Sequence, residues 1–152
     1  MEGIYARESP RLGRAVQIGV AGDRVISVSF PETVPDDAGR DHPLLDRIFD
    51  YLDGADDHFD DVTVALTVPT DKRTVLDAVR NVPYGKTVTV ARVARLAGLD
   101  DEDEGDLNAV REALRANPIP LVIPDHRVSG AGATPTEVAE RLRELETPAT
   151  TR

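Results

Sequence analysis

The sequence predicts an α+β protein in which a small antiparallel sheet precedes a helical region. Between residues 15 and 30, apolar and polar residues alternate around a Gly22-Asp23 turn, which is typical of a β-hairpin with one buried face. After residue 70, the apolar residues recur every three or four positions, which indicates helices. The 152-residue chain is long enough to bury a hydrophobic core. We therefore expect an N-terminal part, residues 1–70, and a C-terminal part, residues 71–152.

Three strands and one helix are expected in the N-terminal part. The hairpin supplies two strands, and its expected buried positions are Val16, Ile18, Val20, Ile26, Val28 and Phe30. A helix should begin after Asp41, a suitable N-terminal cap, and should end at Gly54. The β-branched run 62–68, which Pro69 ends, predicts the third strand.

Four helices are expected in the C-terminal part, at about residues 71–81, 90–97, 107–116 and 136–146. Thr89 and Asp106 are suitable caps for the second and third of these helices, and Gly98 is a suitable stop for the second. Two short helices joined by a turn are compatible with a helix-turn-helix.

A rigid extended segment, residues 117–128, separates the last two helices. Pro118, Pro120 and Pro124 interrupt an apolar run there, so this backbone cannot continue as an α-helix. Asp125, His126 and Arg127 follow directly at its end. Polar side chains delivered by a rigid support are typical of active sites, so we place the candidate site here.

The composition narrows the class of protein. The chain has 28 Asp and Glu residues against 18 Lys and Arg residues, a formal net charge of −10, and its only lysines are Lys72 and Lys86. An acidic surface with few lysines suggests adaptation to high salt, where carboxylates keep the protein hydrated and dispersed. Without such salt, this charge would argue against a nucleic acid partner.

Several kinds of chemistry are excluded by residue types. There is no cysteine, which rules out disulfides, thiolate metal sites and thiol nucleophiles. His42, His58 and His126 are too widely spaced to predict a metal site, and we expect no cofactor. Because the sequence shows neither a membrane-spanning apolar run nor the pattern of a signal peptide, we expect a cytoplasmic protein. We also expect it to be a monomer.

The helix expected at 107–116 has two distinct faces. Leu107, Val110 and Leu114 form an apolar stripe, and Asn108, Arg111 and Arg115 lie together on the neighbouring arc. The polar arc could offer amide and guanidinium groups to a nucleic acid groove. It could equally be the ordinary solvated face of a soluble helix.

Three segments together resemble one known family. Tyr84-Gly85-Lys86-Thr87-Val88-Thr89 resembles its turn motif, and Asn108-Ala109-Val110 resembles the start of its recognition helix. The run from Asn117-Pro118 to Pro124-Asp125-His126-Arg127-Val128 resembles its active-site motif. This family is the methylated-DNA-protein-cysteine methyltransferases, also called 6-O-alkylguanine-DNA alkyltransferases, together with the alkyltransferase-like proteins. The resemblance is strongest between residues 74 and 128.

The resemblance implies a ribonuclease-H-like topology for the N-terminal part and a helix-turn-helix that enters the DNA minor groove. In the family, an alkylated guanine is rotated out of the stack and a cysteine takes its alkyl group. By resemblance, Tyr84, Gly85, Asn117, Pro118 and Pro124 are structural. The catalytic positions implied by the resemblance are those of Asp125, His126 and Glu146. The positions that it implies for DNA contact are Asn108, Arg111, Arg115 and Arg127.

The chain departs from the family at the reacting position. Asp125 stands where the family has its acceptor cysteine, Asn108 replaces an arginine, Val90 replaces a tyrosine, and the loop 129–135 is shorter. A carboxylate is a much weaker nucleophile than a thiolate towards an alkyl carbon, so methyl transfer is not expected. Asp125 could instead cap the turn at residues 126–128.

Three functions remain open from the sequence. The first is a DNA-binding alkyltransferase-like protein without methyl transfer. Its candidate partners are double-stranded DNA with an alkylated guanine and another repair protein. The second is a vestigial scaffold that binds a protein or a small molecule and no DNA. The third is an enzyme that uses Asp125 and His126 as an acid-base pair on another substrate.

Overall fold

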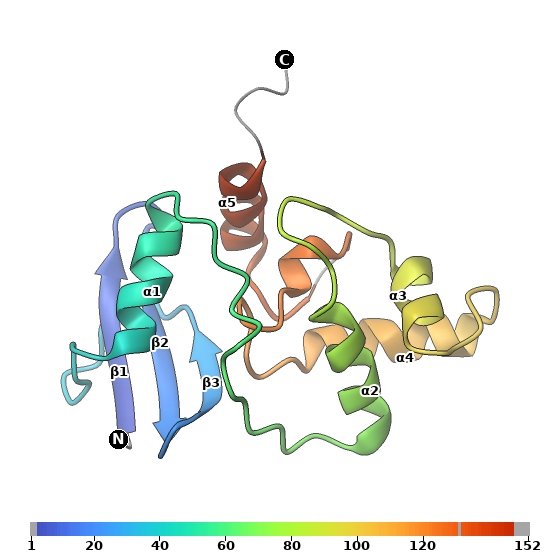
Figure 1. Ribbon diagram of the computed structural model, residues 1–152, viewed down its shortest axis with the longest axis horizontal. Coiled ribbons are helices and arrows are strands. Elements are labelled where there is room, and N and C mark those ends of the chain that lie inside the picture. The colour runs from blue at the N-terminus through green and yellow to red at the C-terminus, as the bar shows by residue number, and fades with distance from the viewer. Residues whose placement is uncertain (1–2, 131, 148–152) are drawn as a thin grey trace.

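The computed structural model describes residues 3–130 and 132–147 and confirms the predicted α+β class. β1 (Gly3–Ser9), β2 (Arg14–Ala21) and β3 (Arg24–Ser29) form an antiparallel sheet in the order β1-β2-β3. α1 (Pro43–Leu52) covers one face of this sheet (Figure 1). Arg7 of β1 joins the two layers, because its guanidinium is 2.7 Å from Asp46 and lies over the ring of Phe49.

The hairpin at residues 14–29 is confirmed, but one predicted inward residue is not buried. The pairing of β2 with β3 shifts register between Gly19 and Val20, so that Val20 pairs with Val25. This bulge inserts Ile26 as an extra residue, and its side chain is 43% exposed instead of buried. Val25 takes the inward position, which the alternation pattern had not assigned to it.

The prediction of the third strand at 62–68 was wrong, because the third strand is β1 at the N-terminus. Residues 62–68 run beside the free edge of β3 and make only an isolated parallel bridge there, between Val25 and Val64. Two backbone hydrogen bonds of 2.9 Å hold them, from Val25 N to Thr63 O and from Ala65 N to Val25 O. The β-branched residues of this segment therefore cover a sheet edge without extending the sheet.

The cap of α1 also differs from the prediction. His42, and not Asp41, is the N-cap, and its Nδ1 accepts a 3.0 Å hydrogen bond from the backbone N–H of Leu44. Gly54, at φ +114°, follows the end of the helix, in the left-handed conformation that glycine adopts at low cost.

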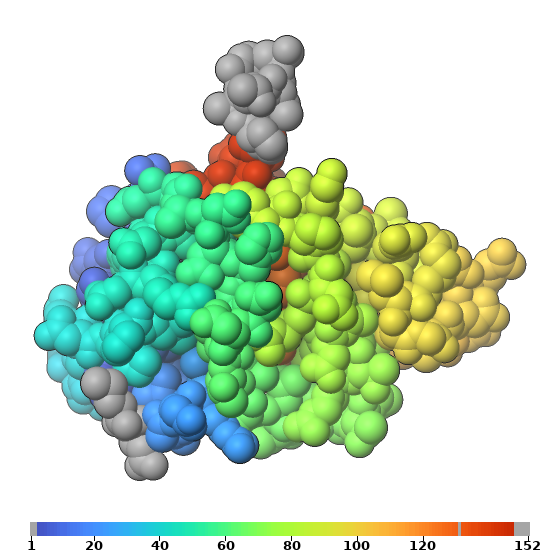
Figure 2. Space-filling view, viewed as in Figure 1, coloured from blue at the N-terminus to red at the C-terminus, as the bar shows by residue number. Residues whose placement is uncertain are grey.

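The C-terminal part contains α2 (Thr70–Val79), α3 (Val90–Leu96), α4 (Glu104–Arg115) and α5 (Thr136–Glu146). α2, α3 and α4 pack on one another, and the turn between α3 and α4 projects at one end of the molecule (Figures 1 and 2). Thr89 caps α3 as predicted, through a bond from Arg92 N to its hydroxyl. The cap of α4 is Asp103 and not Asp106, so α4 begins earlier than predicted.

Residues 117–128, which we call the proline segment, connect the N-terminal and C-terminal parts. Val28 N of β3 donates a 3.0 Å hydrogen bond to Pro118 O, which fixes the proline segment to the sheet edge. Val88 forms an isolated bridge with Val128, so the turn before α3 is fixed to the other end of the same segment. One hydrophobic cluster includes buried residues of both parts. Within the described residues, no helix is long and apolar enough to cross a membrane.

Candidate functional site

Asn117 organises the proline segment from inside. Its Oδ1 accepts a hydrogen bond from Ile119 N at 3.0 Å, and its Nδ2 donates to Ile123 O at 2.9 Å. The same Nδ2 lies 3.1 Å from Asp125 Oδ2. Residues 119–128 are all buried. The Asn117 amide therefore makes hydrogen bonds to backbone groups that water would bond in an exposed turn.

Asp125 begins a short 3-10 helix, η1 (Asp125–Arg127), and is only 2% exposed. Besides the bond from Asn117, its carboxylate accepts bonds from Ala133 N at 3.1 Å and from the Thr134 hydroxyl at 2.5 Å. The predicted cap of residues 126–128 was therefore wrong, because all three donors lie outside that turn. The carboxylate holds the loop before α5 in place.

The backbone of that loop closes directly over Asp125. A Cβ built on Gly132 would lie 2.8 Å from the Asp125 carboxyl carbon, so the loop passes as close as a residue without a side chain allows. Burial raises the pKa of the Asp125 carboxyl, and the bonds from Thr134 and Asn117 only partly oppose that rise. The carboxylate is thus both enclosed and fully bonded.

Glu146, the last residue of α5, is the centre of a buried ionic network. Its carboxylate accepts bonds from His126 Nε2 at 2.8 Å and from Arg127 Nε and Nη2 at 2.9 Å each. Tyr51 Oη of α1 and Gly85 N also donate to it. Burial raises the pKa of Glu146, but the bonds from His126 and Arg127 outweigh burial and bring the pKa to about 2.

Arg127 lies inside the molecule and not on a DNA-accessible surface. Its third donor, Nη1, is 3.0 Å from Val82 O, and its guanidinium lies over the Tyr84 ring at 5.6 Å from the ring centre. With every bond made to buried groups, the guanidinium is not placed for the DNA contact expected from the sequence. The same geometry gives Tyr84 and Gly85 their place in the structure, one as the stacking ring and one as a backbone donor to Glu146.

His126 turns its two ring nitrogens to different environments. Nε2 is bonded to Glu146, whereas Nδ1 is buried and has no hydrogen-bond partner among the described residues. The carboxylate of Asp125 makes its bonds to Asn117, Ala133 and Thr134 and none to His126. The acid-base pair proposed for these two neighbours is therefore not formed.

The polar arc of α4 lies on the surface beside a hollow of about 400 Å³. Arg111 Nη1 is 2.7 Å from Asn108 Oδ1, and Arg115 is exposed one turn further along the helix. The hollow is lined by Thr89, Val90, Ala91, Leu107, Arg111, Leu114, Arg115, Ser129 and Gly130. Asp125 is not part of this lining, so the hollow does not open onto the carboxylate.

Comparison with known proteins identifies the architecture. Residues 71–147 match the family model described as 6-O-methylguanine DNA methyltransferase, DNA binding domain. The chain belongs to this family.

Two relatives illustrate the match. A methylated-DNA–protein-cysteine methyltransferase of Methanothermobacter thermautotrophicus is 37% identical over 110 residues, which cover 68% of this chain and 59% of that protein. The enzyme of the same name from Methanopyrus kandleri is 33% identical over 110 residues, which cover 69% of this chain and 79% of that protein. The chain thus spans about three fifths of the first of these relatives.

Solved structures of the family share the whole fold. The O6-methylguanine methyltransferase of Mycobacterium tuberculosis superposes with a TM-score of 0.75 at 23% identity, over 98% of this chain and 96% of that one. The Mycobacterium tuberculosis OGT in complex with DNA gives a TM-score of 0.72 at 22% identity, over 96% and 95% of the two chains. At this identity the likeness concerns the fold.

Within this family frame, the sequence missed two residues of the site. Tyr51 bonds to Glu146 from 95 positions away, and Thr134 bonds to Asp125 from the loop 129–135, to which the sequence assigned no contact. Tyr51 follows the apolar stripe of α1, since it lies three positions after Ile48, and that spacing was its only signal.

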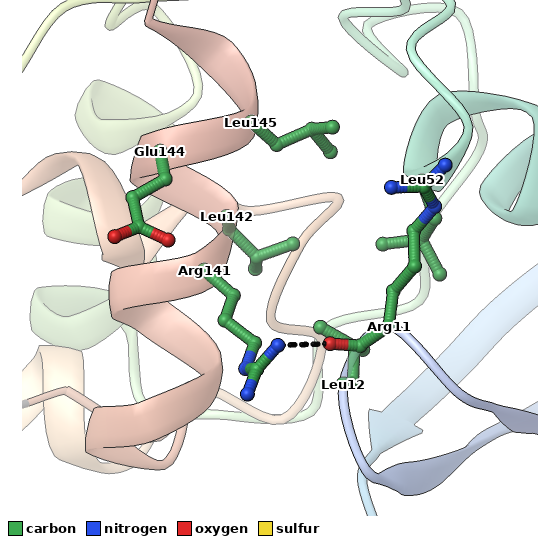
Figure 3. Close-up of a pocket in the computed structure, with 7 residues that line it drawn as sticks. All are labelled: Arg11, Leu12, Leu52, Arg141, Leu142, Glu144 and Leu145. Carbon is green, nitrogen blue, oxygen red and sulfur yellow. Dashed lines mark hydrogen bonds between the residues drawn. The ribbon is translucent and has the colours of Figure 1, made fainter.

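Another hollow lies away from the family's motif residues. It has a volume of about 460 Å³ and lies between the β1–β2 turn, the end of α1 and α5 (Figure 3). Arg141 of α5 crosses it to donate a 2.6 Å bond to Arg11 O. Because none of the candidate residues lines it, we do not place the site there.

Proposed function

We propose that this chain is an alkyltransferase-like DNA-binding protein that recognises DNA without taking an alkyl group from it. The main support for the proposal is the side chain at the position where the family has its acceptor cysteine. Asp125 occupies it, is 2% exposed, and has its carboxylate bonded to three donors. The supporting contacts of Asn117 and the bond of His126 to Glu146 are formed around it.

Both chemistry and access argue against transfer at Asp125. A carboxylate is a weak nucleophile towards an alkyl carbon, and hydrogen bonds from three donors reduce its reactivity further. An alkylated base would also have to displace the loop at Gly132, whose backbone lies against the carboxyl group. The sequence contains no cysteine that could act in its place.

The DNA-binding half of the proposal is supported by α3, α4 and the family to which they belong. The matched model is a DNA binding domain, and the Mycobacterium tuberculosis relative was solved in complex with DNA. On α4, Asn108 and Arg111 lie side by side and Arg115 is exposed. Amide and guanidinium groups of this kind bond to phosphates and to acceptors on base edges.

One observation favours the second function, a scaffold that binds a protein or a small molecule and no DNA. The closed loop over Asp125 leaves no room there for a flipped base, and base access is the reason for base flipping in such proteins. The two functions differ in one property that can be measured, the affinity for duplex DNA.

The test is fluorescence anisotropy with two otherwise identical duplexes, one of which contains O6-methylguanine, in potassium chloride up to about 1 M. We expect the protein to bind duplex DNA and the Arg115→Ala variant to bind several-fold more weakly. Arg24→Ala is the matched control, because Arg24 is an exposed arginine at the far hairpin turn and should leave the affinity unchanged.

Methyl transfer is followed in the same mixtures with a radiolabelled methyl group on the guanine. We expect no label on the protein after long incubation. Binding of neither duplex at any salt concentration would favour the scaffold function, and label on the protein would refute the absence of transfer.

A further inference from the structure

Five consecutive acidic residues end the connection between α3 and α4 and include the first residue of α4. We call residues 100–104, Asp100-Asp101-Glu102-Asp103-Glu104, the acidic turn. It projects from the body of the molecule at the end of the α3–α4 pair (Figure 2). Its position places a dense negative charge at the edge of the surface that the proposed function assigns to DNA.

Two of its carboxylates build the turn itself. Asp100 Oδ1 accepts a 2.9 Å hydrogen bond from Glu102 N, and Asp103 Oδ2 accepts a 2.9 Å bond from Asp106 N as the N-cap of α4. These bonds satisfy backbone donors that have no partner inside a helix. They give Asp100 and Asp103 a local structural role.

Two other carboxylates bind arginines of the two helices. Asp101 Oδ2 lies 2.6 Å from Arg95 Nη1 of α3, and Glu104 Oε1 lies 3.2 Å from Arg111 Nη1 of α4. Arg111 is held a second time, by Asn108 Oδ1 at 2.7 Å. Both guanidinium groups are therefore engaged with acids of their own chain before any phosphate arrives.

We propose that the acidic turn is an autoinhibitory contact, in which Asp101 and Glu104 occupy arginines that would otherwise bind DNA phosphates. This inference rests on the proposed function, because it assumes that the α3–α4 surface meets DNA. It adds a regulator to that surface, namely the ionic strength of the solution.

The physical basis is competition between two anions for one cation. Exposed ion pairs are weak and are screened by salt, so a phosphate can displace Glu104 from Arg111. The unpaired carboxylate is then left beside the DNA backbone, and its repulsion is strongest when salt is low. The wild-type protein should therefore lose less affinity with rising salt than a protein whose arginines are free.

Removing one carboxylate should convert Arg111 into a phosphate contact. Each additional phosphate contact releases counterions and makes the slope of log K against log salt more negative by about 0.9. For Glu104→Gln we expect several-fold tighter binding at low salt and a slope that is steeper by about this amount. The glutamine keeps the length of the side chain and removes only the charge.

Glu102→Gln is the matched control. Glu102 lies in the same turn and its change removes the same charge, but its side chain has no arginine partner in the described parts of the chain. A general reduction of repulsion would raise the affinity of both variants alike. The double variant Glu104→Gln/Arg111→Ala should lose the gain, because the released guanidinium is absent.

The experiment measures duplex binding by anisotropy from about 0.05 to about 1 M potassium chloride for the wild type and these variants. Equal gains for Glu104→Gln and Glu102→Gln, or a gain that persists without Arg111, would overturn the autoinhibitory contact and leave the proposed function standing. If neither the wild type nor any variant binds duplex DNA at any salt concentration, both proposals fail.

Discussion

Asp125 illustrates how a residue can retain the position of a reactive group and serve a structural purpose. Its carboxylate accepts bonds from an amide side chain, a backbone N–H and a hydroxyl, and these bonds join the proline segment to the loop before α5. These donors compensate part of the hydration that the carboxylate loses on burial, and burial still raises its pKa.

Two substitutions separate the charge of Asp125 from its bonds. In Asp125→Asn, the side-chain oxygen can still accept from Asn117 and Ala133, and the amide can donate to the Thr134 hydroxyl. We expect its unfolding free energy to fall by only about 1 kcal/mol, because Asn117 and Ala133 keep their acceptor and only the Thr134 hydroxyl loses the oxygen to which it donates. The measurement is equilibrium urea denaturation.

Asp125→Ala leaves the three donors unpaired in a buried site. We expect a loss of about 2 to 4 kcal/mol in the same urea experiment, from the unsatisfied donors and the vacated volume. A loss as small as that of Asp125→Asn would contradict the structural role of the carboxylate.

The sequence identified the residues of the candidate site more accurately than it identified their contacts. Asp125, His126 and Glu146 were singled out by motif position, but the partners of Asp125 were assigned to the wrong turn. Local spacing can suggest a cap two or three residues away, whereas the Thr134 and Tyr51 contacts depend on where a loop and a helix are placed in three dimensions. The role of each site residue in DNA recognition stays a prediction.

At the scale of elements, α5 is held by its last residue. Glu146 connects α5 with α1 through Tyr51, with η1 through His126 and Arg127, and with the turn before α3 through Gly85. The pKa of Tyr51 is raised by burial and by the neighbouring Glu146, so its hydroxyl remains a donor. One carboxylate thus holds four segments together.

Because of this network, the stability of the fold should depend on pH in the acidic range. The pKa of Glu146 is lowered from 4.5 to about 2, so its ionised form stabilises the fold fully above pH 4.5, and this contribution is lost as the pH falls towards 2. It amounts to about 3 kcal/mol. Asp125, whose pKa is raised by burial, acts in the opposite sense, so a comparison of variants is needed.

Glu146→Gln should therefore be less stable at neutral pH by about 3 to 5 kcal/mol, because Arg127 is left buried without its counter-ion. Its stability should also vary less between pH 4.5 and 2 than that of the wild type. Urea denaturation across this range provides the measurement, with Glu144→Gln, an exposed position on the same helix, as the control. A pH dependence equal to that of the wild type would show that Glu146 is not the titrating group.

Helices and strands were predicted correctly where one regularly spaced apolar face determines their structure. The hairpin at 14–29 and helix α5 were located because their apolar spacing is regular and their neighbours are polar. The run 62–68 has the composition of a strand and was wrongly assigned, since the edge of β3 meets it at only one isolated bridge. β1 was missed because its sequence shows no regular alternation, and its partner β2 makes it a strand.

At the scale of the whole molecule, the net charge of −10 is the dominant feature. Like charges on a folded surface repel one another, and salt shortens the range of that repulsion from about 10 Å at 0.1 M to about 3 Å at 1 M. We expect the midpoint of thermal unfolding to rise with potassium chloride, mostly below about 0.5 M, where the screening length changes fastest.

Differential scanning fluorimetry over a series of potassium chloride concentrations provides this measurement. A midpoint that is constant or falls with salt would contradict adaptation to high salt. The composition raised this expectation, and neither the fold nor the family bears on it.

The family and the fold class were accessible from the sequence because the motif residues 84–89 and 117–128 are continuous in the chain. The closure over Asp125 was not accessible, since it requires the loop at Gly132 to fold back against a residue of another segment. We therefore infer that DNA contacts the exposed surface of α4 and does not reach the enclosed carboxylate of Asp125.

The most direct measurement of this claim is a titration of ¹⁵N-labelled protein with duplex DNA, followed by amide chemical shifts. We expect shifts concentrated on the start of α3 and on the polar arc of α4, around Thr89, Asn108, Arg111 and Arg115, with the amides of Asp125, Ala133 and Thr134 unchanged. Shifts centred on Asp125 and its loop, or confined to the hollow between the β1–β2 turn, the end of α1 and α5, would contradict it.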